Sequence, residues 1–188
     1  MKIKRVYHSR LTAEMIDYEP KCRDRVNEYY ANLDKSDIPV TDIKTPGDII
    51  RIDGLNMKIL AVKNPEFRNY NDSSVVIRAW DKRKSVLFLG DAGEGEGQKL
   101  LDGPYANDLN CDYIQMAHHG QNGCNEHFYK TVNFNACIWP TPMWVWNNDA
   151  GKGINTHILK TFDTRRWMDQ KGIKEHHVSC LEGIWRLD

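Results

Sequence analysis

Two segments of the sequence place side chains that can bind a metal directly after apolar runs. Ser85–Leu89 is followed by a glycine and Asp91, and a second apolar run ends in His118 and His119 before another glycine. Each pattern is typical of a β-strand that runs into a loop, so we expect a carboxylate and an imidazole at two strand ends. Asp and His are ligands of hydrolytic zinc and manganese centres. The pair therefore predicts part of a metal site.

The sequence alone does not decide the role of Asp91 or which of the two histidines is the ligand. Asp91 could instead cap the helix that follows it, because aspartate caps helix N-termini well and its charge suits the helix dipole. If the strand continues through His118 and His119, their side chains point in opposite directions. One of them would then be a ligand, and the other would orient it or contact substrate. The chain has seven histidines, but they form no dense His/Asp cluster in the sequence.

Length and charge predict one soluble domain. The chain has 188 residues, which suits a single domain with one buried core. Lysine plus arginine equals aspartate plus glutamate, at 26 each, so no global field attracts an anionic membrane or nucleic acid. We expect no membrane partner, whereas local recognition of nucleic acid is not excluded. No stretch approaches the ~20 apolar residues of a membrane span.

The cysteines indicate a reducing, cytoplasmic location. There are five, an odd number, widely spread and without a C-x-x-C pair. Cys111 and Cys124 flank the histidine pair, but their spacing matches no standard structural zinc site. We therefore expect these thiols to be small buried apolar groups.

Apolar periodicity predicts an α/β fold in which strands and helices alternate through the second half of the chain. The turn residues Asp53 and Gly54 predict a hairpin. The expected strands are Ile3–Tyr7, Val40–Ile43, Ile49–Ile52, Met57–Val62, Ser74–Trp80, Ser85–Leu89, Cys111–Met116, Ala136–Trp139, Lys174–Ser179 and Gly183–Leu187, and the expected helices are Pro20–Leu33, Glu94–Leu101, His127–Val132 and Asn155–Lys171.

Two other segments have unusual composition. Gly93, Gly95 and Gly97 alternate with glutamates that would repel phosphate, so we interpret them as a flexible turn. Trp144 and Trp146 belong to a tryptophan-rich segment after an expected strand. Such rings either fold back on the core or line a cleft, where they can stack on a base, a sugar or a choline-like cation.

Three ordered motifs resemble a known family. Asn71–Ile77 (NDSSVVI), Val86–Asp91 (VLFLGD) and Ala117–Gly120 (AHHG) are similar to the second half of the metallo-β-lactamase-fold hydrolases. The closest similarity is to the branch that contains the hydrolase domains of bacterial DNA-uptake channels and the choline-phosphate esterases. The resemblance covers roughly residues 38–132.

This resemblance implies a four-layer αββα sandwich with one or two metal ions, zinc or alternatively manganese, at a sheet edge. Asp91 would be the carboxylate that bridges the metals, and His118 or His119 would ligate one of them. Asn71, Trp144 and Trp146 are the candidate substrate contacts. The implied reaction is hydrolysis of a phosphoester or phosphodiester by metal-bound hydroxide.

One departure from the family is large. Its principal signature, His-x-His-x-Asp-His, does not occur in this sequence. The chain is therefore expected to be the second half of such a hydrolase or a truncated form, completed by a missing N-terminal half or a homodimer partner. The alternatives are a catalytically inactive binding or oligomerisation module that kept the fold, and an unrelated α/β binding protein.

Overall fold

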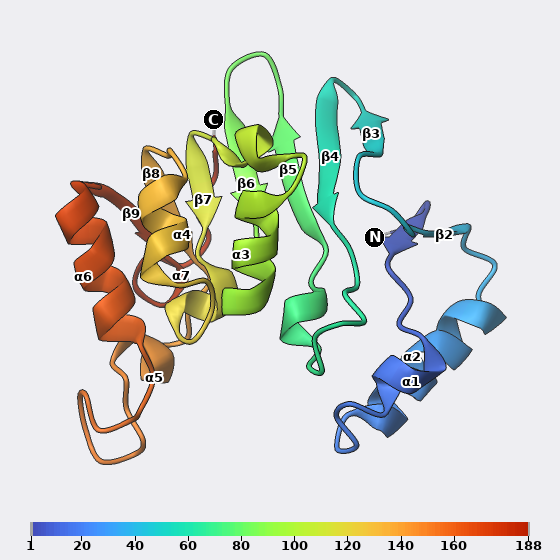
Figure 1. Cartoon of the computed structure of the whole chain (residues 1–188), viewed down its shortest axis with the longest axis horizontal. Helices are drawn as coiled ribbons and strands as arrows, with labels where there is room; N and C mark the ends of the chain where they lie inside the picture. Colours follow the sequence, from blue (N-terminus) through green and yellow to red (C-terminus); the bar gives the residue numbers. More distant parts are fainter. Residues whose placement is uncertain (1, 188) are drawn as a thin grey trace.

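The computed structural model describes residues 2–187 and contains one large β-sheet. Its seven strands follow one another across the sheet in chain order (Figure 1). The first four are antiparallel neighbours, whereas the last four are parallel and joined through helices. The strands are β3 (Ile49–Ile52), β4 (Leu55–Ala61), β5 (Val76–Trp80), β6 (Ser85–Phe88), β7 (Tyr113–Gln115), β8 (Ala136–Trp139) and β9 (Glu175–Val178). The mixed α/β fold expected from the sequence is confirmed.

Helices cover one face of this sheet. Figure 1 shows α3 (Glu94–Asp102), α4 (Glu126–Thr131) and α6 (Thr161–Lys171) side by side in front of the strands. The main core lies between the two layers. It contains Leu87 of β6 together with Leu100, Phe128 and Met168, one from each helix.

The opposite face of the sheet has much thinner cover. Phe88, the neighbour of Leu87 in β6, points to this face and is 42% exposed. The C-terminal segment, residues 183–187, lies across part of it. Trp185 stacks on His177 of β9 with ring centroids 3.6 Å apart, and Leu187 lines a small hollow with Val86. Near β4, Ile43, Ile59 and Val62 form a second, smaller core on this face.

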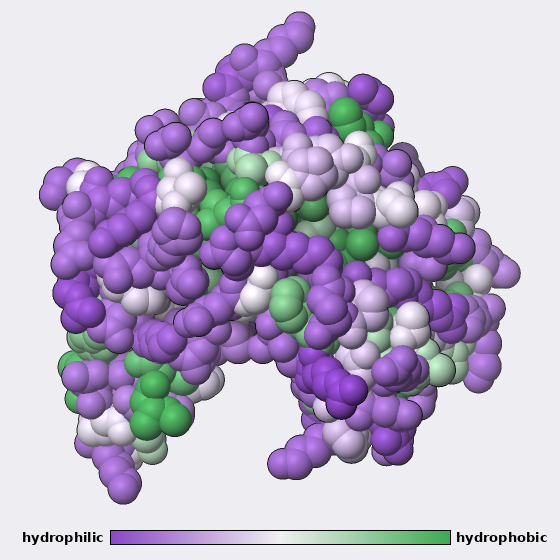
Figure 2. All heavy atoms as spheres, in the orientation of Figure 1, coloured by the Kyte–Doolittle hydropathy of each residue, from purple (hydrophilic) through white to green (hydrophobic). Residues whose placement is uncertain are grey.

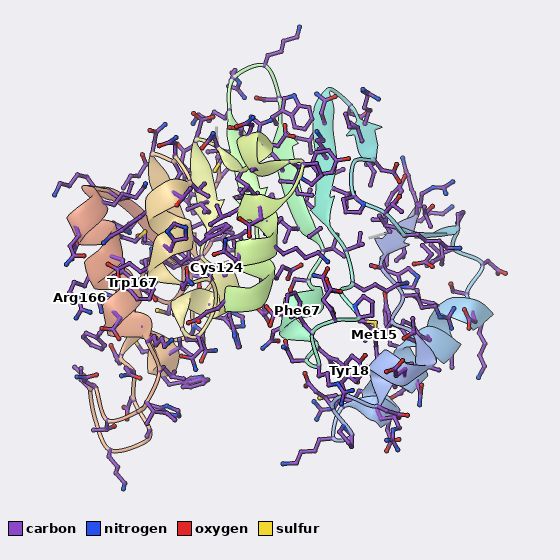
Figure 3. All side chains as sticks on the ribbon, in the orientation of Figure 1. Met15, Tyr18, Phe67, Cys124, Arg166 and Trp167 are labelled. Atoms are coloured by element: carbon purple, nitrogen blue, oxygen red, sulfur yellow. The ribbon has the colours of Figure 1, made fainter. Side chains whose placement is uncertain are left out.

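The N-terminal residues form a small separate layer beside the sheet. The strands β1 (Val6–His8) and β2 (Val40–Asp42) pair in parallel, and α1 (Ala13–Ile16) and α2 (Arg23–Lys35) connect them. This unit is tied to the segment after β4, because the hydroxyl of Tyr18 donates to the Pro65 carbonyl at 3.0 Å. Figure 3 shows Met15 and Tyr18 on the side of the unit nearest to Phe67.

Most expected elements are present, and the predicted hairpin turn is confirmed. Asp53 and Gly54 join β3 to β4, and both adopt positive φ, at 48° and 86°. The tryptophan-rich segment forms the short helix α5 (Met143–Trp146), and α7 (Ser179–Glu182) follows β9.

Three expectations are wrong. The helix predicted at Asn155–Lys171 begins only at Thr161, because Asn155 has φ of 59° and belongs to a loop. The predicted strand Gly183–Leu187 does not form; these residues lie on the sheet without pairing with it.

The third concerns the three alternating glycines. They do not form a flexible turn, because Gly93 is the residue immediately before α3 and the other two lie within the helix. A Cβ atom on Gly95 would lie 2.7 Å from the Phe67 ring, and one on Gly97 would lie 3.1 Å from Cys124 Sγ. These glycines allow α3 to pack closely against its neighbours.

Candidate functional site

The N-terminus of α3 is capped by Asp72 and not by Asp91. One carboxylate oxygen of Asp72 accepts hydrogen bonds from the backbone N–H groups of Gly93 and Glu96, both at 3.0 Å. Asp72 thus satisfies two of the free N–H groups at the start of the helix. Asp72 therefore caps this helix, which was the alternative role for Asp91. The Asp91 side chain is 44% exposed.

Hydrogen bonds fix the chain on both sides of Asp91. Its own N–H donates to Ser74 Oγ at 3.0 Å. The preceding Gly90 has φ of 57°, and a Cβ atom there would lie 3.0 Å from the same hydroxyl oxygen. Gln115 at the end of β7 accepts from the N–H of Gly90 at 2.8 Å. The ends of β6 and β7 are therefore held together, as expected for adjacent parallel strands.

The two histidines lie in a tight turn, not in a continuing strand. His118 and His119 have φ of 49° and 60°, and Gly120 has φ of 80°. Three consecutive residues in this region are unusual, since non-glycine residues seldom adopt it. A Cβ atom on Gly120 would lie 2.4 Å from the Trp139 ring, so the turn needs glycine for space as well as for conformation. The strand alternation expected for the two histidines does not occur.

His119 is the histidine that faces Asp91. Its Nδ1 lies 2.7 Å from the carbonyl oxygen of Pro140, and its Nε2 lies 3.8 Å from Asp91 Oδ1. The Pro140 carbonyl can only accept, so Nδ1 carries a proton, and Nε2 is the ring nitrogen left to bind a metal. This arrangement, a ring N–H on a backbone carbonyl with the other nitrogen free, is typical of metal-binding histidines. Thr141 further fixes the turn by donating its hydroxyl to the His119 carbonyl at 2.6 Å.

His118 has a different environment. Its ring centroid lies 6.0 Å from that of His119. Its Nδ1 is buried and has no hydrogen-bond partner among residues 2–187. The backbone N–H of His118 donates to the Gly90 carbonyl at 3.0 Å, which ties the histidine turn to the loop that carries Asp91. Of the two histidines, His119 has the geometry of a ligand paired with Asp91.

The Asp91 and His119 pair fits part of a zinc site but not a complete one. Ligand atoms about 2.1 Å from a tetrahedral zinc lie roughly 3.4 Å from each other, close to the observed 3.8 Å. A catalytic zinc takes three protein ligands. Within the part of the chain that the structure describes, no group of three or more His, Cys, Asp or Glu side chains could hold a metal ion.

The cysteines do not contribute ligands here. Burial raises the pKa of Cys111 to about 12 and raises that of Cys124 well above its usual value. Cys124 lies in the main core and Cys111 packs against it, as expected for thiols that act as small apolar groups. The five cysteines are free thiols.

The candidate substrate contacts lie in different surroundings. The carbonyl of Asn71 accepts from the hydroxyl of Ser74, which in turn holds the Asp91 backbone. Trp144 is 51% exposed on α5. Trp146 packs edge-on against the buried Trp139 at 5.4 Å between centroids. Trp146 thus supports the core, whereas Trp144 is free to contact a ligand.

Four supporting residues were not identified from the sequence: Asp72, Ser74, Gln115 and Pro140. Each acts through a hydrogen bond to a distant loop, so spacing along the chain does not reveal the contact. The one available signal is that Asp72 and Ser74 belong to the NDSSVVI motif.

No helix among the described residues is long and apolar enough to cross a membrane. No family model matches the sequence, and no curated protein matches it. Among solved structures, the chain is similar to the metallo-beta-lactamase fold protein YhfI from Bacillus subtilis, with a TM-score of 0.46 and 11% identity, over 93% of this chain and 73% of that one. This likeness concerns the course of the backbone, and the roles of Asp91 and His119 rest on the geometry described above.

Proposed function

We propose that this chain supplies the carboxylate and one histidine of a metal centre in a metallo-β-lactamase-like hydrolase, of the branch that its motifs resemble. The observation that supports this most strongly is the orientation of His119, whose Nδ1 is held by the Pro140 carbonyl while Nε2 faces Asp91. The metal is zinc, or alternatively manganese, and when bound it acts as a Lewis acid on the ester. The substrate class is a phosphoester or phosphodiester.

The remaining ligands come from outside residues 2–187, either from a missing half of the sandwich or from a homodimer partner. The open sheet face supports this part of the proposal, because Phe88, Ile52 and Leu55 expose 42%, 48% and 39% of their surface. Apolar sheet faces of this kind are normally covered in soluble proteins. Sedimentation should show a dimer or larger species at micromolar concentration, and a compact monomer would contradict the proposal.

The low number of ligands favours a second function, a binding or oligomerisation module that kept the fold without catalysis. Two ligands do not form a catalytic centre. The two functions differ in whether a partner that supplies the missing ligands produces hydrolytic activity. A hydrolase would then cleave a phosphodiester such as bis(4-nitrophenyl) phosphate, whereas a binding or oligomerisation module would not. The isolated chain is inactive under both.

Zinc titration by calorimetry tests the proposed site. The isolated chain should bind zinc weakly and substoichiometrically, and Asp91→Ala together with His119→Ala should abolish that binding. His118→Ala is the matched control, because this neighbouring histidine does not face Asp91, and it should retain most of the binding. Tight stoichiometric zinc that survives the double change would place the metal elsewhere.

A further inference from the structure

A pocket lies between α3 and the end of β4, apart from the candidate metal ligands. It has a volume of about 260 Å³, and neither Asp91 nor His119 lines it. Figure 2 shows the side of the molecule that α3 covers, where apolar atoms are visible in gaps between mostly hydrophilic side chains. The wall of the pocket is mainly apolar and includes Leu60, Ala61, Val62, Leu100, Pro104 and Tyr105.

Tyr105 is held in place as one wall of this pocket. The Lys58 ammonium lies 4.3 Å from the centroid of the Tyr105 ring and pairs with Asp108 at 2.7 Å. The Tyr105 hydroxyl packs against Gly47, where a Cβ atom would lie 2.3 Å from the hydroxyl oxygen. A side chain at position 47 would therefore displace the ring. The wall is formed before any ligand arrives, as is usual for small-molecule sites.

Three polar residues that line the pocket form a cluster. Asn64 Oδ1 accepts from the Lys99 ammonium at 2.5 Å, and Asn64 Nδ2 donates to Glu96 Oε1 at 3.2 Å. Glu96 stays protonated near pH 7, because burial raises the pKa of its carboxyl to about 9. Lys99 is therefore the charged member of this cluster.

Lys99 has one N–H donor that the described part of the chain does not use. An ammonium has three, and the other two go to Asn64 and to Glu66. The side chain of Glu66 is 47% exposed, and exposed ion pairs of this kind contribute little to stability. A second lysine at the pocket, Lys63, donates to the Arg10 carbonyl, which carries no charge. The two lysines and the one paired glutamate leave a net positive charge of one beside an apolar cavity.

We propose that this pocket binds a small organic carboxylate with an apolar body, such as a single-ring aryl carboxylate. The ring lies against the apolar wall, and the carboxylate accepts the third N–H of Lys99. A single net positive charge matches a monoanion. The size agrees, because a cavity of about 150 Å³ holds benzene and one of 260 Å³ has room for a ring with a carboxylate. This inference does not depend on the proposed function, because the candidate metal ligands do not line the pocket.

Titration of the intact chain with phenylacetate, phenylacetamide and acetate, followed in methyl ¹H–¹³C NMR spectra, tests the inference. Phenylacetate should bind with a Kd of roughly 1 mM, as expected for a ligand of about ten non-hydrogen atoms. Its ring should shift the methyl resonances of Leu60, Val62 and Leu100 and leave that of Met168, elsewhere in the main core, unchanged. Acetate, which lacks the ring, should bind at least about tenfold more weakly. Phenylacetamide, which lacks the charge, should bind about fivefold more weakly.

Variants of two matched lysines test the role of the charge. Lys99→Gln should abolish the preference for phenylacetate over phenylacetamide, whereas the amide should still bind. Lys160→Gln is the control: both lysine side chains are 50% exposed and pair with a glutamate, but Lys160 does not line the pocket. Glu66→Gln should tighten phenylacetate binding about threefold, because it removes a carboxylate that competes for Lys99. Circular dichroism confirms that each variant is folded.

The inference is overturned if the three pocket methyl groups show no saturable shift up to about 10 mM phenylacetate. A preference for the carboxylate that persists in Lys99→Gln, or that Lys160→Gln also removes, would overturn it as well. Unchanged phenylacetate affinity in Glu66→Gln would show that the ligand does not reach the Lys99 ammonium, with the same consequence.

Discussion

The two faces of the seven-stranded sheet differ in how the chain covers them. On the helix-covered face, Leu87, Ile114 and Met116 are completely buried under α3, α4 and α6. On the open face, Phe88 is 42% exposed; Ile43 buries Ile59 of β4 in a second, smaller core, and Trp185 of the C-terminal segment stacks on His177 of β9. Stability should therefore depend mainly on the helix-covered face, and the open face is where we propose that another sheet associates.

The largest expected effect comes from adjacent residues on opposite faces of β6. Leu87→Ala should lower the free energy of unfolding by about 3 kcal/mol, because it leaves a cavity in the main core. Phe88→Ala should cost less than about 1 kcal/mol in dilute solution, because the ring keeps much of its exposure. Urea unfolding of both variants measures the difference. Equal costs would mean that the open face is covered in solution.

A second pair of variants tests the packing of the histidine turn against Trp139, on the helix-covered side. Gly120→Ala should cost roughly 2–4 kcal/mol, because the new Cβ atom overlaps the Trp139 ring and φ is 80°. Gly151→Ala is the control: its φ is 85°, but nothing lies within 4 Å of the added atom. It should cost only about 1 kcal/mol. If the two changes cost the same, the Trp139 contact is not tight.

Glu96, a fully buried residue in the first turn of α3, makes the stability of the helix-covered face depend on pH. Burial, and then the charge of Asp72, raises the pKa of this carboxyl to about 9. The folded state therefore holds a proton that the unfolded state loses above about pH 4.5, so this group's contribution to stability is full below that pH and is lost as pH rises toward 9. The free energy of unfolding of Glu96→Gln, relative to that of wild type, should be higher at pH 8 than at pH 5 by roughly 1–3 kcal/mol. Urea unfolding at the two pH values measures this, and a pH-independent difference would show that Glu96 is ionised in the folded protein.

Local patterns predicted the strands and most helices, because their apolar periodicity reflects the face that each buries. They failed for residues 155–160, which were predicted to be helical but belong to a loop that the hydrogen bonds of Asn148 hold in place. At the candidate site, the sequence predicted Asp91 and one of the two histidines as ligands, and it could not choose between His118 and His119. That selection depends on the Pro140 carbonyl, twenty-one residues away, and on a turn that only Gly120 allows.

The central claim is that His119 and Asp91 are metal ligands, and ¹⁵N NMR of the histidine side chains during zinc titration tests it most directly. We expect the His119 Nε2 resonance to shift with the first additions of zinc while Nδ1 keeps its proton on the Pro140 carbonyl. Asp91→Asn should weaken this response, because it removes the charged partner 3.8 Å away. An unchanged His119 resonance, with zinc-dependent shifts at His176 or His177 instead, would contradict the assignment.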